Sequence, residues 1–453
     1  MLQRITLKNV GPLSDFSFDF GNRLTVMTGD NGVGKTFLLD IVWYVLTRQW
    51  PMDVNPAMLS GQIAMPQKAK GESFFNGYSK NSYGTPFVHF SYDGLRQNWN
   101  IGGDKREFYG DSSLVVYAFA DGSIAVWDSL KNYNDDNFLS VKPSAFVFTS
   151  KNVWDGLKNA ENSKSSDLYL CNGLIRDLVT WKLQKSWEFD CVNNILKLCS
   201  PSNFKFKLGN PRRVSINDAR DIPTIKMPYG EVPVTMASAG VRRILSLAYS
   251  LTWAVSENRK MSRVTGTDFT KNVTFLIDEV ESHLHPKWQR QIMSGLLQVF
   301  SSLYDAKTLK RTKKDFLPNV QILAATHSPL VMASLEDIFD PDKDKWIDFD
   351  SDTKGRILVE ERPFEKMGTS DQWLKSEAFD MKSTRSKIVA DLMDKVNALY
   401  QQRLDKSLSA KEIVAVNAKI KIITEKLLSK LSPSDAYCLR LMALCEQIGV
   451  DIK

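Results

Sequence analysis

The sequence of 453 residues predicts an α/β fold with a mixed central sheet, an inserted antiparallel β region and a C-terminal helical hairpin. Apolar stretches that end in glycine or polar residues occur at 24–28, 273–277 and 320–325, a pattern typical of buried parallel strands. Residues 86–128 alternate apolar and polar side chains, which indicates a small antiparallel sheet. Between 383 and 431, apolar residues recur at spacings of three and four, which predicts two paired amphipathic helices.

The length and composition indicate a globular chain of two or three domains, with 43% hydrophobic and 25% charged residues. The longest apolar runs, such as 37–46, are too short to span a membrane, so no membrane partner is expected. The N-terminus begins with a strand-like pattern rather than a signal peptide. The five cysteines form no C-x-x-C pair, so we expect a reduced, cytoplasmic location.

A glycine-rich loop lies between the first buried strand and a helix predicted at 37–46. Residues 29–36 fit the pattern G-x-x-x-x-G-K-[ST]. This pattern indicates phosphate binding when it lies between a strand and a helix, as it does here. Backbone N–H groups and the helix start would bind phosphates, Lys35 would reach the β- and γ-phosphates, and Thr36 would hold Mg²⁺. The nucleotide-binding candidates here are Gly29, Asn31, Gly32, Gly34, Lys35 and Thr36.

Two acids follow the strand at 273–277, where a parallel strand would deliver them to one edge of the sheet. Asp278 would hold Mg²⁺ through water, and Glu279 would orient or deprotonate an attacking water. The alternative is a buried strand followed by an acidic turn without a chemical role.

His327 follows the strand at 320–325 and would lie at the same sheet edge, within reach of a γ-phosphate or its attacking water. A lone histidine at a strand end is, alternatively, a structural residue. Ser238 and Gly240 belong to a small-residue turn that opens a long apolar helix. Ser238 is a candidate N-cap, and the helix start is a second candidate anion site.

Taken in order, these elements resemble the ABC-type, AAA-family ATPases of the SMC, RecF and OLD group. Val280 stands where proline is frequent and Ala239 where glycine is frequent, and neither change removes a catalytic group. The resemblance implies that ATP and Mg²⁺ are the cofactors and that Lys35, Glu279 and His327 are catalytic. The residues that carry it are Gly29–Thr36, Ser238–Gly240 with Arg242 and Arg243, Phe275–Pro286 and Thr326–Pro329.

The resemblance also implies a homodimer or higher oligomer in which each ATP lies between one subunit's glycine loop and the other's Ser238–Gly240 signature loop. The family usually has a glutamine that senses Mg²⁺ or water, for which Gln62 and Gln67 are both possible. Members often carry a Toprim nuclease after the histidine, but residues 335–453 contain no Toprim, HNH or zinc pattern. The chain is in this respect similar to ATPase subunits of the Septu, PARIS and retron-associated anti-phage defence systems, which control a separate effector, for example a nuclease.

Three other functions stay open: a DNA-repair or recombination ATPase, the ATP-hydrolysing subunit of a transporter, and a scaffold that binds ATP without hydrolysis. Two basic stretches, 205–213 and 307–314, indicate nucleic-acid binding or simply solvated loops. The helical hairpin could pack on the ATPase core or contact a partner. The expected domains are a split ATPase domain (1–50 and 200–340), an inserted region (51–199) and a C-terminal helical region (341–453).

Overall fold

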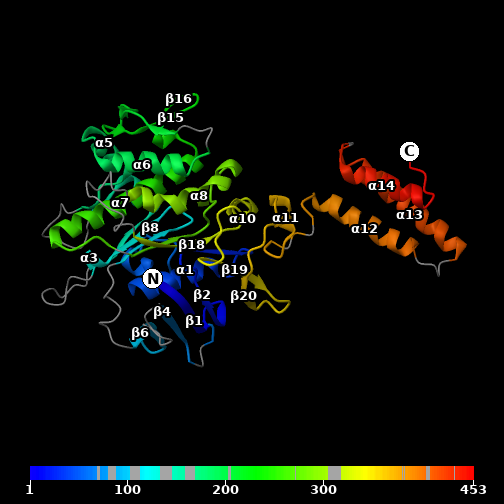
Figure 1. Cartoon of the computed structure of the whole chain (residues 1–453), viewed down its shortest axis with the longest axis horizontal. Coiled ribbons are helices and arrows are strands. Elements are labelled where there is room, and N and C mark those ends of the chain that lie inside the picture. Colours follow the sequence, from blue (N-terminus) through cyan, green and yellow to red (C-terminus); the bar gives the residue numbers. More distant parts are fainter. Residues whose placement is uncertain are drawn as a thin grey trace. The chain divides into compact units, whose positions relative to one another are not determined.

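The chain divides into two compact units, Met1–Trp373 and Leu374–Lys453. None of the helices in the described part of the chain combines the length and apolar character needed to cross a membrane. The computed structural model (Figure 1) describes residues 1–68, 72–79, 88–102, 113–132, 145–158, 169–201, 206–270, 272–304, 318–379, 381, 383–404, 409–432 and 434–452.

A mixed sheet of eight strands, counted over the described residues, forms the centre of the first unit. Five neighbouring strands from β19 to β7 are parallel, and antiparallel strands extend the sheet at both sides. The predicted α/β class is therefore confirmed. In spatial order the strands are β20 (Ile357–Arg362), β19 (Asp344–Ser351), β3 (Leu24–Gly29), β18 (Asn319–Ala325), β17 (Asn272–Ile277), β7 (Ser113–Ala118), β8 (Ile124–Asp128) and β9 (Phe146–Phe148).

The assignment of 86–128 to one inserted antiparallel sheet is wrong for its second half. Strand β7 pairs in parallel with β17, and β8 and β9 follow it in the central sheet. All of β7 after its first residue is buried, as expected for a strand covered on both faces. The Asp121-Gly122 turn does join β7 and β8 in an antiparallel hairpin, but this hairpin belongs to the central sheet, as the apolar run at 114–119 indicated.

A second sheet, entirely antiparallel, joins the N-terminal hairpin to the strands after the first helix. The antiparallel β region is thus confirmed, but it pairs with the chain's start rather than standing apart. Helix α1 (Lys35–Thr47) is buried nearly all round because it lies between this sheet and the central one. Tyr44 contacts Phe90 on one side (ring centroids 5.0 Å apart), and Trp43 faces Tyr117 on the other (6.3 Å). The strand order is β2 (Leu13–Asp19), β1 (Leu2–Val10), β4 (Phe74–Ser79), β5 (Val88–Asp93) and β6 (Asn98–Gly102).

Helices cover the other face of the central sheet (Figure 1). Trp253 of α7 meets Phe146 and Phe148 of β9 edge-on, with ring centroids 5.0 and 5.3 Å apart. Residues 174–198 form two helices rather than one, because Lys185 between them has a left-handed backbone (φ 51°). The helices of this layer are α5 (Leu174–Leu183), α6 (Trp187–Leu198), α7 (Ala239–Thr265), α8 (Pro286–Leu303) and α10 (Pro329–Leu335).

The helical assignment of 341–453 is wrong for its first part, because β19 and β20 complete the central sheet beside β3. Residues 344–351 form a largely buried strand, but the acidic residues within this segment do not fit the usual apolar pattern of a buried strand. Shorter elements of the first unit are α2 (Pro51–Val54), α3 (Ser129–Asn132), α4 (Ser150–Asp155), β10 (Leu157–Lys158), β11 (Tyr169–Cys171), β12 (Lys207–Leu208), β13 (Arg212–Arg213), β14 (Asp221–Ile222), β15 (Thr224–Met227), β16 (Gly230–Pro233), the 3₁₀ turn Val234–Met236 and α11 (Ser370–Lys375).

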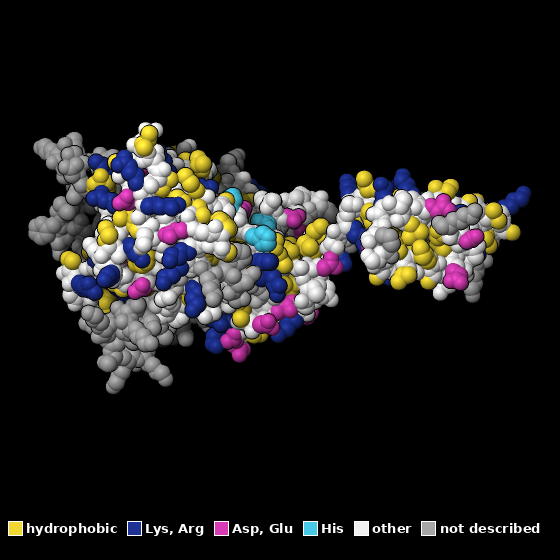
Figure 2. Space-filling model, turned by 90° about the horizontal axis from the view of Figure 1, so that it is seen from above, with side chains coloured by type: hydrophobic (Ala, Val, Ile, Leu, Met, Phe, Trp, Pro, Cys, Tyr) yellow, Lys and Arg dark blue, Asp and Glu magenta, His cyan; other side chains and the backbone are white. Residues whose placement is uncertain are grey.

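The second unit consists of the predicted helical hairpin and one further helix: α12 (Lys387–Arg403), α13 (Ala410–Leu428) and α14 (Ala436–Gln447). Val396, Leu427 and Leu441, one from each helix, share a small buried core. Figure 2 shows hydrophobic side chains spread over the surface of this unit. The largest exposed ones are Ile388, Leu404, Val414, Ile422, Leu439 and Met442.

Candidate functional site

The glycine loop connects the end of β3 to the start of α1. Lys35, only 4% exposed, turns back over the loop, and its Nζ donates to the carbonyl oxygens of Gly29 (2.8 Å) and Asp30 (2.7 Å). Burial lowers the pKa of Lys35 to about 8, against the attraction of nearby acids led by Asp278. Gly29 has φ 128°, and a methyl group there would lie 2.0 Å from the Phe349 carbonyl oxygen of β19. Only glycine fits, because the loop runs directly along this strand.

Thr36 and Asp278, 242 positions apart in sequence, meet at the start of α1. Thr36 Oγ1 donates to Asp278 Oδ2 over 2.8 Å. Burial raises the pKa of Asp278, and the Thr36 hydrogen bond acts in the opposite direction. A hydroxyl and a carboxylate are oxygen ligands of the kind that Mg²⁺ takes in nucleotide sites, directly or through water. The side chains present therefore fit Mg²⁺.

Glu279 follows Asp278 in a left-handed backbone conformation (φ 44°), uncommon for a residue with a side chain. Such strain is often found at functional sites. Two backbone hydrogen bonds fix the turn. The Ser282 N–H donates to the Glu279 carbonyl (2.8 Å), and the Val280 N–H donates to the Ala325 carbonyl of β18 (3.1 Å). Glu279 is half-buried and within electrostatic reach of Lys35.

His327 lies one strand away, at the same edge of the sheet. Its ring is half-buried and within electrostatic reach of Lys35. Burial and the Lys35 charge lower the pKa of His327, and Glu279 opposes them. The structure therefore brings Lys35, Thr36, Asp278, Glu279 and His327 together, as the sequence analysis predicted.

Glu281 is a site residue to which the sequence analysis gave no role. Its carboxylate accepts from Thr326 Oγ1 (2.7 Å) and from the His327 backbone N–H (2.5 Å). Burial raises its pKa, and these two hydrogen bonds act against that rise. Glu281 thus fixes the backbone that carries His327. The sequence signal that could have indicated Glu281 is its position two residues after Glu279.

A second unpredicted group is the pair of Asp40 and Tyr117, buried beneath the nucleotide site. Tyr117 of β7 donates to Asp40 Oδ1 of α1 over 3.0 Å. Asp40 lies one helical turn after Thr36, on the same face of α1. Burial raises the pKa of Asp40 well above its usual range, and the Asp278 charge adds to the rise. The sequence gave no signal for this pair, because a lone aspartate in an apolar helix has many possible partners.

We expect Asp40→Asn to stabilise the chain relative to wild type, and increasingly so as pH rises. With its pKa raised, folded Asp40 keeps a proton that the unfolded chain loses, so wild-type stability falls between pH 4 and the folded pKa. Each unit of raised pKa corresponds to about 1.4 kcal/mol. Asparagine can accept the Tyr117 hydrogen bond and has no such pH dependence. Thermal melts of both proteins at pH 5 and pH 8 check this, and an equal difference in melting temperature at both pH values would contradict it.

The signature loop, Ser238–Gly240, opens helix α7. Ser238 caps the helix by accepting from the Val241 N–H, although the distance is long (3.5 Å). A methyl group at Gly240 would lie 2.7 Å from the His283 carbonyl oxygen, so this loop packs against the turn after Glu279. Both residues line a cavity of about 620 Å³ to which no glycine-loop residue contributes. The other residues lining it are Phe206, Met227, Ala239, Val241, His283, Leu284, His285, Lys287 and Trp288.

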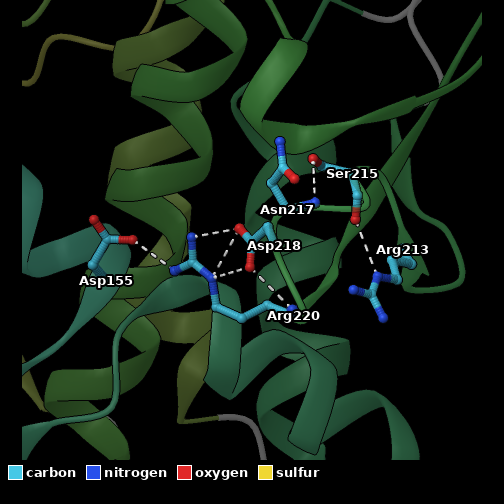
Figure 3. A network of polar contacts seen from close by, with 6 residues as sticks. All are labelled: Asp155, Arg213, Ser215, Asn217, Asp218 and Arg220. Atoms are coloured by element: carbon cyan, nitrogen blue, oxygen red, sulfur yellow. Dashed lines mark hydrogen bonds and ion pairs between the residues drawn. The ribbon is translucent and has the colours of Figure 1, made fainter.

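The predicted basic stretches are only partly described. Lys205 and residues 307–314 lie outside the described residues. Arg213 donates to the carbonyls of Ser215 and Ile216, and Arg220 of the same hairpin bridges Asp155 and Asp218 (Figure 3). These guanidinium groups therefore already hold the loop between β13 and β14. Nucleic-acid binding and the role of Gln62 or Gln67 remain predictions.

Two family descriptions match parts of the chain. Residues 4–94, which contain the glycine loop, match "AAA domain". Residues 226–333, which contain Ser238, Asp278 and His327, match "AAA domain, putative AbiEii toxin, Type IV TA system". The resemblance to AAA-family ATPases stated from the motifs is thereby confirmed.

The chain is also similar to individual proteins. It is 21% identical over 340 residues to a Septu protein PtuA of Bacillus thuringiensis, covering 73% of this chain and 72% of that protein. A "Retron Vc95 probable ATPase" of Vibrio cholerae serotype O1 biovar El Tor is 38% identical over 60 residues, which is 13% of this chain and only 8% of that protein.

Solved structures to which the chain is similar include an SMC head bound to the C-winged helix domain of ScpA. It is 12% identical, covers 81% of this chain and 98% of its own, and has a TM-score of 0.41. The recombination mediator RecF with a bound ATP analogue is 12% identical, covers 80% and 98%, and has a TM-score of 0.36.

Proposed function

We propose that this chain binds and hydrolyses ATP with Mg²⁺, in sites that two copies of the chain complete together. The meeting of Thr36 and Asp278 beside Lys35, at the end of the strand that carries Glu279, supports hydrolysis most strongly. One chain contributes a glycine loop with its acids, and its signature loop lines a cavity to which no glycine-loop residue contributes. This separation supports a site completed by a second copy, as the family resemblance implies.

Each residue then has a distinct part in the reaction. Lys35 and the loop N–H groups bind the phosphates, and Thr36 and Asp278 would hold Mg²⁺. Glu279 orients a water molecule for attack on the γ-phosphorus and takes its proton. His327, fixed by Glu281, donates a hydrogen bond toward the γ-phosphate or the attacking water. The Mg²⁺ held by Thr36 and Asp278 would supply positive charge against the charge that develops on the phosphate oxygens.

Mixing two inactive variants tests the shared site. Lys35→Met removes the phosphate-binding amine, and Ser238→Arg places a bulky charge on the signature loop, so we expect each protein alone to be inactive. A mixed dimer contains one site built from the intact loop of each chain. Half of randomly formed dimers are mixed, so about a quarter of wild-type ATPase activity should return. No recovery, with mixed dimers shown by differential tagging, would contradict the shared site.

We further propose that the chain is the ATPase subunit of an anti-phage defence system and controls a separate effector. The similarity to a Septu protein PtuA over 340 residues supports this, together with the resemblance of the motifs to stand-alone defence ATPases. The exposed apolar side chains of α12–α14 offer a surface for a partner or for another copy.

Purification of the tagged chain from cells that also express its genomic neighbours tests the defence role. We expect a neighbouring protein to be retained, and phage protection to require both that protein and an intact Lys35. A chain that retains no neighbour, and whose ATPase activity DNA ends or gaps stimulate severalfold, would favour a DNA-repair ATPase instead.

A further inference from the structure

Lys287 lies in the first turn of α8 and lines the same cavity as Ser238 and Gly240 of the signature loop. It is exposed, and its side chain forms no ion pair and no hydrogen bond within the described part of the chain. The glycine loop contributes no residue to this cavity. Lys287 is therefore a cation beside the signature loop that has no described partner in its own chain.

Backbone contacts fix the start of α8 against the signature loop. A methyl group at Gly240 would lie 2.7 Å from the His283 carbonyl oxygen, so the two segments are in direct contact. His285 caps α8, because its Nδ1 accepts from the Lys287 N–H over 3.2 Å. Trp288, the next residue, is buried in the wall of the cavity. The backbone of Lys287 is thus held beside the loop, and its flexible side chain is free to reach a ligand.

The first turns of the helices show where negative charge is missing. Helix N-termini carry partial positive charge, which acids in the first turn compensate. Helices α5 and α6 have such acids, whereas α7 and α8, whose first turns line the cavity, have none. The described residues that line the cavity also include no acid. Two helix starts and Lys287 thus bring positive charge to one place without a counter-charge from the described residues.

Helix α1 shares this combination of features with α8. Its first turn lacks an acid and begins with Lys35, and its start is the proposed phosphate site. The likeness between the two helix starts indicates that phosphate is the missing counter-charge beside Lys287. In the proposed dimer, the phosphate that reaches the signature loop belongs to the ATP held by a second copy.

We propose that Lys287 binds the γ-phosphate of the ATP held on the glycine loop of a second copy, with its Nζ donating to a phosphate oxygen. This inference rests on the proposed function, in which the signature loop of one chain meets the ATP of the other. Lysine suits the position, since a charged amine on a flexible stem can follow the phosphate as two copies come together. Each ATP then lies between Lys35 of the chain that holds it and Lys287 of the chain that completes the site.

The mixture of K35M and S238R chains tests this, because its mixed dimer contains a single intact site. The S238R chain supplies the glycine loop of that site, and the K35M chain supplies the signature loop and Lys287. Lys287→Met is added to one chain at a time. Arg290→Met on the K35M chain is the matched control, because Arg290 is another exposed cation of α8 and does not line the cavity. For each mixture we would measure kcat/KM for ATP per mixed dimer, counted by differential tagging, and the melting temperature of each chain.

We expect Lys287→Met on the K35M chain to lower the recovered kcat/KM by about tenfold or more, the size of effect of one lost hydrogen bond to a charged group. The same substitution on the S238R chain should leave the recovered activity unchanged, because that Lys287 faces the site that K35M has already inactivated. Lys287→Arg on the K35M chain should keep at least about a third of the activity, since a charged donor remains. R290M should equal the parent mixture, and no variant should melt more than a few degrees below its parent.

An equal loss with Lys287→Met on either chain would overturn the inference, as would no loss on the K35M chain or an equal loss with R290M. A loss that follows a lowered melting temperature and is not rescued by K287R would show a structural role and overturn it too. A loss that vanishes when activity is expressed per mixed dimer would assign Lys287 to dimer assembly instead of phosphate binding. If the parent mixture of K35M and S238R recovers no activity, the proposed shared site itself fails, and the inference fails with it.

Discussion

Glu279→Gln should leave ATP binding intact and lower the rate of ATP hydrolysis by at least about 100-fold, because general base catalysis contributes 10²- to 10⁴-fold. Glutamine keeps the size of the side chain but cannot take a proton. The left-handed backbone at this position is unchanged, so the turn that carries Glu281, which accepts from the His327 backbone, should be preserved. Phosphate release, measured with saturating ATP and Mg²⁺, checks the rate.

The same variant should accumulate as an ATP-bound assembly of two or more chains. Size-exclusion chromatography with and without ATP measures this, and Glu425→Gln on exposed α13 is the matched control. Hydrolysis by E279Q at the wild-type rate would show that Glu279 is not the base. Wild-type protein that assembles with ATP and never releases phosphate would indicate a scaffold that binds ATP without hydrolysing it.

Lys35→Met should weaken ATP binding by about 100-fold or more, since loss of one partner from a buried charged contact costs 2–5 kcal/mol. The Lys35 amine lies over the loop, where it donates to the Gly29 and Asp30 carbonyl oxygens. An incoming phosphate would replace these carbonyls as its hydrogen-bond partner. Methionine keeps the apolar length of the side chain and removes the charge. Isothermal titration with a slowly hydrolysed ATP analogue gives the Kd.

Lys343→Met is the control for this change, because Lys343 forms only a surface ion pair with Asp340. Such pairs contribute little, so this variant should bind ATP as the wild type does. If K35M binds ATP with unchanged affinity, the glycine loop is not the nucleotide site.

More of the candidate site than of the central sheet could be predicted from the sequence. The glycine loop, Asp278-Glu279 and His327 each follow an apolar run, and parallel strands bring their ends to one edge regardless of which strands lie between them. Strand order has no such local signal. Strand β7 was therefore assigned to a separate inserted sheet, and β19 to a helical region, although each is buried in the central sheet.

Contacts between single residues on distant elements could not be predicted at all. Tyr117 and Asp40 lie 77 positions apart and meet only because α1 is packed on β7. Arg243 is one of two consecutive arginines, and only the fold shows which one turns inward. Periodicity gives the buried face of an element but not its neighbour, so buried polar pairs emerge only from the three-dimensional arrangement.

Strand β19 also supports the glycine loop from behind. Thr28, one residue before the loop, donates to Asp348 (2.7 Å) and accepts from Trp346 Nε1 (2.8 Å), both from β19. The smallest fragment able to work as an ATPase must therefore continue to about residue 373, well beyond the last nucleotide motif at His327. A chain cut at 340 would leave β3 as an open sheet edge, with unpaired backbone groups that invite aggregation. For exchanging the C-terminal helices between relatives, the suitable junction thus lies after Lys375, where α11 ends, and before Lys387, where α12 begins.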